Sequence, residues 1–371
     1  MVSARKYRPD TFESVVGQLG VVSTLRNALK LGQVAHAYLF CGPRGVGKTT
    51  CARILAKAVN CSSLSPEGDP CNQCDSCRGF NEGRSLNIFE QDAASNNSVD
   101  DIRALIEQLR YVPQNGKRNV YIIDEVHMLS TAAFNAFLKT LEEPPAHALF
   151  ILATTEKHKL PATILSRCQK FDFRRIQVNE IADHLAHIAQ AETITTERDA
   201  LQLIAIKADG GMRDALSIFD QMVNFGGRKV TYRNVLENLA ILDYDEFIAL
   251  TEHLLKQDHA AALLHLQKIL DAGHELGSVQ TGLVEHFRNL LVAQSTATTD
   301  LLELADEVKA RYMDLAQRID PSFLLGAFHL ASEAESKLRN SSQPRLHTEL
   351  LLIKLCHLPS VIQLADSAGK K

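Results

Sequence analysis

The chain has 371 residues, of which 45% are hydrophobic and 23% charged, and its formal net charge is −4. This length exceeds what one compact core usually holds, so two or three domains are expected. The sequence has no apolar run long enough to cross a bilayer and no signal-peptide core near its start, so we expect a cytoplasmic protein without membrane contact. The slightly negative charge excludes a uniformly basic surface, so any contact with nucleic acid would be local or shared within an assembly.

The first half of the chain alternates short apolar runs with segments of helical periodicity, a pattern that predicts a parallel sheet covered by helices. We expect strands at residues 37–40, 87–91, 120–124, 149–154 and 169–173. Residues 121–123 and 150–152 are apolar on both faces, which favours central strands over edge strands. The prediction is an α/β nucleotide-binding domain over residues 1–178, interrupted by an inserted module at about 61–84.

A glycine-rich motif follows the first expected strand and precedes a helical segment: Gly42-Pro43-Arg44-Gly45-Val46-Gly47-Lys48-Thr49, with Thr50 next. It fits the P-loop pattern G-x-x-x-x-G-K-[ST] in the required context. Backbone N–H groups of such a loop wrap phosphate oxygens, and the helix dipole adds to the attraction. We expect Lys48 to reach the β- and γ-phosphates of ATP and Thr49 to offer its hydroxyl to Mg²⁺. An ordinary glycine-rich turn is the alternative, and the flanking strand and helix disfavour it.

The inserted module is rich in Ser, Pro, Gly, Asn and Cys and lacks periodicity. Cys71, Cys74 and Cys77, together with Cys61 upstream, supply four thiols whose spacing suits a tetrahedral, structural Zn²⁺ site. A polar insert this short cannot build its own core, so a bound metal would supply folding free energy. An iron–sulfur cluster and free thiols are the alternatives, whereas disulfides are disfavoured in a reducing compartment.

The strand expected at 120–124 ends in two neighbouring acidic residues, Asp124 and Glu125. This arrangement would place one carboxylate beside the metal ion and the other where water attacks. We therefore predict that Asp124 holds Mg²⁺ and that Glu125 is the general base. An ordinary acidic strand end is the alternative, and the P-loop upstream favours the functional interpretation.

From about residue 179 onward, the strand signals disappear and helical periodicity takes over. Glycine pairs at 210–211 and 226–227 bound a helix expected at 212–225, so we predict a small helical lid domain over residues 179–242. A helical collar domain over 243–371 would follow, with helices at 247–255, 260–270, 282–293, 301–319, 322–340 and 345–358. Pro321 lies at a helix start, where its missing N–H is harmless.

Four short motifs, in order along the chain, carry a family resemblance: Asp124-Glu125-Val126-His127, Leu141-Glu142-Glu143-Pro144-Pro145, Ala153-Thr154-Thr155 and Ser166-Arg167-Cys168. With the opening Arg5-Lys6-Tyr7-Arg8-Pro9 and the cysteine insertion, they resemble the gamma/tau subunits of bacterial DNA polymerase III over essentially the whole chain. The resemblance implies an AAA+ ATPase that converts ATP to ADP and phosphate within the polymerase III holoenzyme and does not itself polymerise DNA.

The resemblance also assigns roles that spacing alone does not. Thr155 matches sensor 1, which contacts the γ-phosphate or the attacking water, and Arg213 matches sensor 2 on the lid. Arg167 matches the arginine finger that reaches the ATP of a neighbouring subunit. The family's zinc module falls on the four cysteines of the insert. Its adenine- and ribose-packing segment falls on Tyr7, Arg8, Pro9, Val16 and Gly17.

By the same resemblance, the partners are other clamp-loader subunits in a pentameric ring, a sliding clamp and primer–template DNA. ATP binding would let the ring open the clamp and place it on DNA, and hydrolysis would release the loader. The DNA contacts would be salt-sensitive backbone contacts, for which the N-terminal half of a helix at 99–111 is a candidate.

Three alternatives remain: a protein unfoldase, a branch-migration motor and a catalytically silent scaffold subunit. Residues 92–98 lack the aromatic side chain that an unfoldase pore loop needs, and a branch-migration motor would not need the cysteine insert. The intact Lys48 and Glu125 disfavour a silent subunit.

Overall fold

The structure is a computed structural model that describes residues 3–109, 111–113, 116–239, 242–302, 304, 306–338 and 341–368. The chain divides into two compact units. The first comprises Met1–Glu192 with Lys207–Gln221, and the second comprises Thr193–Ile206 with Met222–Lys371. This division differs from the three domains expected from the sequence, whose boundaries stay a prediction.

A five-stranded, all-parallel sheet in the order β2-β3-β4-β1-β5 forms the centre of the first unit. All five expected strands are present, within about one residue of the predicted ends. Their bounds are β1 (Ala37–Cys41), β2 (Ile88–Asp92), β3 (Asn119–Asp124), β4 (Ala148–Thr154) and β5 (Gln169–Asp172). β3 and β4 are internal and almost wholly buried, as their two apolar faces predict. The edge strand β5 buries one residue of four.

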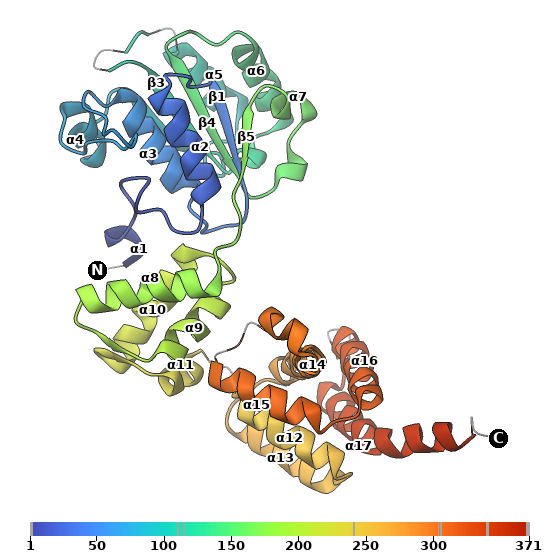
Figure 1. Ribbon diagram of the computed structural model, residues 1–371. Coiled ribbons are helices and arrows are strands. Elements are labelled where there is room, and N and C mark those ends of the chain that lie inside the picture. The colour runs from blue at the N-terminus through green and yellow to red at the C-terminus, as the bar shows by residue number, and fades with distance from the viewer. Residues whose placement is uncertain are drawn as a thin grey trace. The chain divides into compact units, whose positions relative to one another are not determined.

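Helices cover both faces of this sheet (Figure 1), and alternate residues of each strand supply the two cores. Tyr38 and Phe40 of β1 pack with α2 (Leu19–Lys30) and α3 (Lys48–Asn60). Leu39 and its neighbours Ala37 and Cys41 pack on the other face, with α5 (Val99–Gln108), α6 (Thr131–Glu142) and α7 (Ala162–Leu165). The remaining elements of this unit are α1 (Ser3–Lys6), α4 (Asp75–Asn81), η1 (Val126–Met128), η2 (Lys157–Lys159) and α8 (Val178–Ala191).

The strand register sets where polar loops emerge. Cys41 of β1 lies opposite Thr154 of β4, and Asp92 of β2 lies opposite Asp124 of β3. Since parallel strands end on the same edge of a sheet, the residues after β1, β3 and β4 gather at one edge. The glycine-rich motif, the acidic pair and Thr155 therefore meet there.

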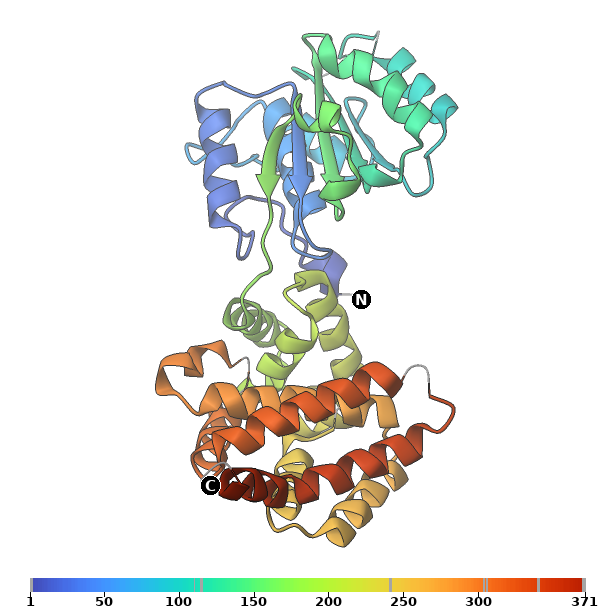
Figure 2. The same cartoon turned by 90° about the vertical axis from the view of Figure 1, so that its right-hand side faces the viewer.

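The second unit is mainly helical, as expected (Figure 2). Its C-terminal helices pack around one apolar core. Its elements are β6 (Thr195–Thr196), α9 (Arg198–Lys207), α10 (Met212–Gly226), β7 (Lys229–Val230), α11 (Tyr232–Asn238), α12 (Tyr244–Leu255), α13 (His259–Asp271), α14 (Leu276–Ala293), η3 (Thr296–Leu301), α15 (Asp306–Gln317), α16 (Pro321–Leu338) and α17 (Pro344–Ala368). α9 and α10 are divided between the two units, since Lys207 and residues 212–221 belong to the first. Pro321 begins α16, as predicted.

Four expectations about this half are wrong. β6 and β7 form a two-residue parallel pair where no strand was expected, because isolated pairing this short has no periodicity to reveal it. α14 begins at Leu276, before the predicted residue 282, and α15 begins at Asp306, after the predicted residue 301. α17 continues through Pro359, whereas the prediction ended the helix at 358. Proline removes one helical hydrogen bond, which weakens a helix without forbidding it where a long segment is anchored by packing.

The aromatic ring of Phe247 packs against the backbone of α14 at Gly282. A Cβ atom at position 282 would lie 2.2 Å from Phe247 Cζ, and Phe247 is 4% exposed. Glycine in a helix interior normally lowers stability, so its presence here is explained by the approach of the ring.

Gly282→Ala should therefore destabilise the helical unit by about 1–3 kcal/mol, because overpacking outweighs the gain in helix propensity. Gly277→Ala is the matched control: it lies in the same helix, and a Cβ there meets nothing within 4 Å. It should change stability by less than about 0.5 kcal/mol. Urea unfolding followed by helical circular dichroism measures both. Equal effects of the two substitutions would contradict the packing explanation.

Candidate functional site

A cavity of about 760 Å³ lies at the carboxyl edge of the sheet within the first unit. Most of the predicted nucleotide-site residues line it, although they come from five separated stretches of sequence. These are Tyr7, Arg8, Pro9, Val16, Arg44, Gly45, Val46, Gly47, Lys48, Thr49, Thr50, Asp124, Glu125 and Arg213.

The glycine-rich loop has backbone geometry that only glycine adopts readily. Gly42 has φ +148°, and a Cβ there would lie 2.4 Å from the carbonyl oxygen of Phe173. Gly47 has φ +106° and precedes α3 with no side-chain cap on the helix. An uncapped helix N-terminus leaves backbone N–H groups for an anionic ligand, which suits phosphate.

The Lys48 side chain folds back onto this loop. Its Nζ donates hydrogen bonds to the carbonyl oxygens of Gly42, at 2.8 Å, and Pro43, at 2.6 Å. Lys48 is 6% exposed, and burial lowers the pKa of its ammonium group, opposed by the charges of Glu125 and Asp124. A bound phosphate would supply the missing counter-charge more strongly than the two carbonyls do.

The Asp124 carboxylate joins the P-loop helix to the end of β3. Its Oδ2 accepts a hydrogen bond from Thr49 Oγ1 at 2.6 Å, and its Oδ1 accepts from the backbone N–H of Glu125 at 2.9 Å. A hydroxyl and a carboxylate oxygen side by side are hard ligands of the kind that Mg²⁺ prefers. The donor set therefore fits the expected magnesium position.

Glu125 lies in the left-handed region, with φ +46°, which is unusual for a residue with a side chain. Its Oε2 accepts hydrogen bonds from Thr155 Oγ1 at 2.9 Å and from the backbone N–H of Thr155 at 3.2 Å. The structure thus places the predicted general base and the predicted sensor 1 in direct contact.

His127, for which the sequence predicts no role, lies next to Glu125. Its side chain is 6% exposed, with Nδ1 3.0 Å from Thr154 Oγ1 and 3.4 Å from Glu125 Oε2. Its Nε2 lies 3.1 Å from a carboxylate oxygen of Glu156. The imidazole therefore lies in contact distance of the Glu125 carboxylate and helps to hold it.

Some predicted site residues do not line the cavity. Gly42 and Pro43 contribute through their carbonyl contacts with Lys48, and Thr155 contributes through Glu125. Gly17 (φ +74°) packs against Ile176. Arg167 is held elsewhere, as its guanidinium donates to Glu142 Oε1 at 2.6 Å and to the carbonyl oxygen of Thr163 at 2.8 Å. The roles assigned to these residues stay predictions.

Other lining residues were missed from the sequence: Ala4, Val15, Asp92, Ile176, His184, Met212, Leu216 and Ser217. Asp92 ends β2 and could have been found, since it stands at the same sheet edge as Asp124. No sequence signal marks His184, whose pKa is lowered by burial and then by the neighbouring His187.

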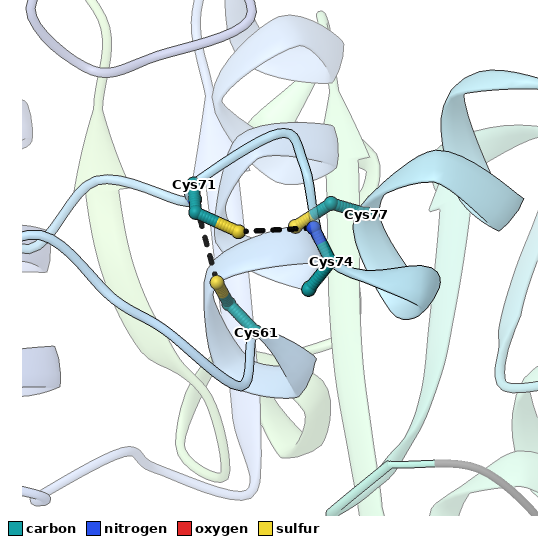
Figure 3. A group of neighbouring side chains, drawn as sticks. All are labelled: Cys61, Cys71, Cys74 and Cys77. Carbon is teal, nitrogen blue, oxygen red and sulfur yellow. Dashed lines mark hydrogen bonds between the residues drawn. The ribbon is translucent and has the colours of Figure 1, made fainter.

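The four cysteines of the insert gather at the end of α3, with all four Sγ atoms within 4.8 Å of one another (Figure 3). Cys61 Sγ accepts a hydrogen bond from the backbone N–H of Cys71, and Cys71 Sγ accepts from that of Cys74, each at 3.3 Å. Four convergent sulfurs that accept backbone N–H groups suit a metal held as a tetrathiolate. Among the described residues, this is the one such group of potential metal ligands.

The remaining cysteines, Cys41, Cys51, Cys168 and Cys356, are buried and outside this cluster. Burial raises the pKa of Cys51 to about 12, which is the behaviour of an inert packed thiol.

A P-loop at the carboxyl edge of a parallel sheet, with a hydroxyl–carboxylate pair beside it and helices after the sheet, defines an AAA+-type P-loop protein. Three family models match the chain in succession. "DNA polymerase III, delta subunit" matches residues 17–177, "DNA polymerase III clamp loader subunit, ATPase lid domain" matches 180–228, and "DNA polymerase III subunits gamma and tau domain III" matches 230–369.

Relatives that align with almost the whole chain are also named as subunits of DNA polymerase III. The chain is 40% identical to "DNA polymerase III subunit tau" of Bacillus subtilis, over 95% of this chain and 62% of that protein. It is 34% identical to "DNA polymerase III subunit gamma" of Buchnera aphidicola subsp. Acyrthosiphon pisum, over 95% of this chain and 98% of that protein. The chain belongs to the gamma/tau subunit family of DNA polymerase III.

The chain spans 62% of the length of the Bacillus subtilis tau subunit and 55% of the Escherichia coli one. Among solved structures, the RuvB Holliday junction branch migration motor of Thermotoga maritima aligns over 67% of this chain and 79% of that chain, with 22% identity and a TM-score of 0.48. None of the helices in the described part of the chain has the length and apolar character needed to cross a bilayer.

Proposed function

We propose that this chain is the ATP-hydrolysing motor subunit of the DNA polymerase III clamp loader, which opens the sliding clamp and places it on primer–template DNA. The observation that carries the proposal is the gathering of four predicted catalytic residues in one cavity: Lys48 for phosphate, Thr49 and Asp124 for Mg²⁺, and Glu125 for water. A silent scaffold subunit would not need this set. The membership in the gamma/tau family supports the assignment to the loader.

Each side chain of the proposed active site has a separate role in ATP hydrolysis. Lys48 exchanges its two carbonyl partners for phosphate oxygens of ATP, which neutralises charge on the β- and γ-phosphates. Thr49 and Asp124 would hold Mg²⁺, which screens the charge that develops as the γ-phosphoryl group departs. Glu125 accepts a proton from the attacking water as the new P–O bond forms and the bond to ADP breaks. Thr155 holds the Glu125 carboxylate in place.

Two arginines would supply positive charge from different directions. Arg213 of the lid lines the chain's own cavity, and its backbone N–H lies 3.4 Å from the carbonyl oxygen of Gly45. Arg167 does not line this cavity and is partly exposed, with its side chain beside Glu142. This placement supports a role for Arg167 at the ATP of a neighbouring subunit in a ring.

The cysteine cluster would hold one structural Zn²⁺. Its position directly after α3, on the side of the P-loop helix away from the phosphate loop, favours a structural over a catalytic role. The other loader subunits, the clamp and primer–template DNA are the proposed partners, in the bacterial cytoplasm.

An unfoldase or a branch-migration motor is the competing function for an AAA+ core of this kind. The segment after β2 (residues 92–98) still offers no aromatic pore-loop side chain, and the family relatives are replication proteins. The ATPase rate with and without primed DNA plus clamp decides between these functions. Stimulation that requires both the clamp and primed DNA supports the loader, and stimulation by an unfolded protein or a four-way junction would contradict it.

Lys48→Ala should abolish measurable ATP binding, since removing one partner of a buried charge pair costs about 2–5 kcal/mol. Glu125→Gln keeps the side-chain shape and an acceptor for Thr155 but cannot take a proton. It should bind ATP normally and hydrolyse it about 10²–10⁴-fold more slowly. Calorimetric titration and phosphate release separate the two effects. If both variants lose binding alike, the division of roles is wrong.

The purified protein should contain about one zinc per chain and show no visible absorption from iron. Cys74→Ser should lose most of this zinc and destabilise the insert, while the sheet, which has its own core, stays folded. Cys356→Ala is the control, because that thiol is buried in the helical unit apart from the cluster. Zinc is measured by atomic absorption, and a folded, active, metal-free wild type would refute the structural role.

Arg167→Ala should keep ATP binding yet lose hydrolysis by about 10³-fold, the scale of other arginine fingers. Glu142→Ala is the matched control, because it removes the same ion pair and leaves the guanidinium. Mixing Arg167→Ala with Lys48→Ala subunits should restore activity wherever an intact Arg167 meets an intact Lys48 site. Mixed oligomers that stay inactive after confirmed subunit exchange would count against a shared active site.

A further inference from the structure

The N-terminal segment at residues 7–17, here called the strap, forms one wall of the cavity. Tyr7, Arg8 and Pro9 line the cavity at one end of the strap, and Val15 and Val16 line it at the other. The residues between them do not line it. The contacts that hold this middle part of the strap therefore set the position of the cavity wall.

The middle of the strap is held by the cysteine module. Asp69 Oδ1 accepts the backbone N–H of Phe12 at 2.6 Å, and its other carboxylate oxygen pairs with Arg26 of α2. Asp69 and Phe12 are 7% and 1% exposed, so this charge-assisted hydrogen bond is shielded from water.

A second contact reinforces the first. Asn72 Nδ2 donates to the backbone oxygen of Asp10 at 3.4 Å and to Asp10 Oδ2 at 3.3 Å. Its Oδ1 accepts from Lys57 Nζ at 2.6 Å, and Lys57 belongs to the P-loop helix α3 and is 3% exposed. Asn72 has φ +56°, a left-handed backbone that asparagine tolerates better than most residues.

Both anchors depend on the position of Cys71. Asp69 lies two residues before this cysteine and Asn72 follows it directly. Cys71 is in turn fixed by the hydrogen bond of its N–H to Cys61 Sγ and by the bond that its own Sγ accepts from the N–H of Cys74. A metal bound by the four thiolates would lock this geometry.

We propose that Asp69 and Asn72 are positioning residues for the nucleotide pocket, and that metal occupancy of the cysteine module raises nucleotide affinity by fixing the strap. The inference rests on the proposed function, because it takes the cavity to be an adenine nucleotide site with the strap on its base and ribose side. Lys48 makes its hydrogen bonds within the P-loop itself, and the hydrogen bond from the strap to the P-loop helix, from Arg8 Nε to Thr50 Oγ1, is a long one at 3.4 Å. The coupling is therefore selective for the nucleoside part of the ligand.

The test compares affinities for Mg·ADP and for inorganic pyrophosphate by calorimetry, with zinc content measured on the same samples. Asp69→Ala should weaken ADP binding by about tenfold, or about 1.4 kcal/mol, and leave pyrophosphate binding unchanged. Asp69→Asn retains an acceptor for the Phe12 N–H and should recover part of the loss. Glu67→Ala is the control, since Glu67 is an exposed carboxylate of the same module outside these contacts.

Removal of the metal is the second part of the test. Stripping zinc from the wild type should weaken ADP binding to a similar extent and raise hydrogen exchange at the strap amides in the nucleotide-free protein. Stripping it from Asp69→Ala should cause little further loss, because both changes break the same connection. Asn72→Ala serves in place of Asp69→Ala if that variant does not fold.

Wild-type ADP affinity in zinc-loaded Asp69→Ala would overturn the inference, and so would equal losses of ADP and pyrophosphate binding. Full additivity of metal removal and the substitution would also overturn it. Failure of the proposed function has a different signature: the wild type would bind neither ADP nor pyrophosphate, or Lys48→Ala would bind both as well as the wild type does.

Discussion

The parallel pairing of β1 with β4 and of β4 with β3 is the interaction on which the site depends. These strands are buried on both faces, so their backbone polar groups are satisfied only within the sheet. Parallel pairing then directs all three strand ends to one edge. The loop at Gly42, the carboxylates at 124–125 and Thr155 meet at that edge because of the register, although more than 100 positions separate the first from the last.

At that edge, the reactive groups are engaged with one another. Lys48 donates to two loop carbonyls, Asp124 accepts from Thr49, and Glu125 accepts from Thr155. A buried ammonium or carboxylate without partners would be costly, so these contacts stabilise the site. A nucleotide would replace the weakest of them, the neutral carbonyls around Lys48, with charged phosphate oxygens.

The strap connects three parts of the first unit. Just before the strap, Ser3 donates its backbone N–H to Asp220 Oδ2 of α10 at 2.5 Å, and Tyr7, the first strap residue, donates its hydroxyl to Glu192 directly after α8. Further along, Phe12 is bound to Asp69 of the cysteine module. The strap and the residues just before it thus link α8 and α10, the cavity wall and the cysteine module, and each link is a hydrogen bond to a carboxylate. Such bonds are stronger than neutral ones and more sensitive to loss of a partner.

The sequence alone determined the class of the protein and most of the residues that line the cavity. Strand burial patterns, the P-loop and the Asp124-Glu125 pair are local signals, since each is written in a few adjacent residues. The four cysteines are likewise a local pattern, and the structure brings their sulfurs together.

Only the tertiary structure decided which distant groups touch. His127 against Glu125, Asp69 against Phe12 and the Phe247 ring against Gly282 join positions whose spacing follows no period. The continuation of α17 through Pro359 also appears only in the structure, where Ile362 beyond the proline packs against the apolar core of the second unit. Such contacts arise from how elements pack after they form. Local sequence patterns therefore predict the helices and strands and the type of chemistry at the site. Tertiary packing determines which residues far apart in the sequence are in contact.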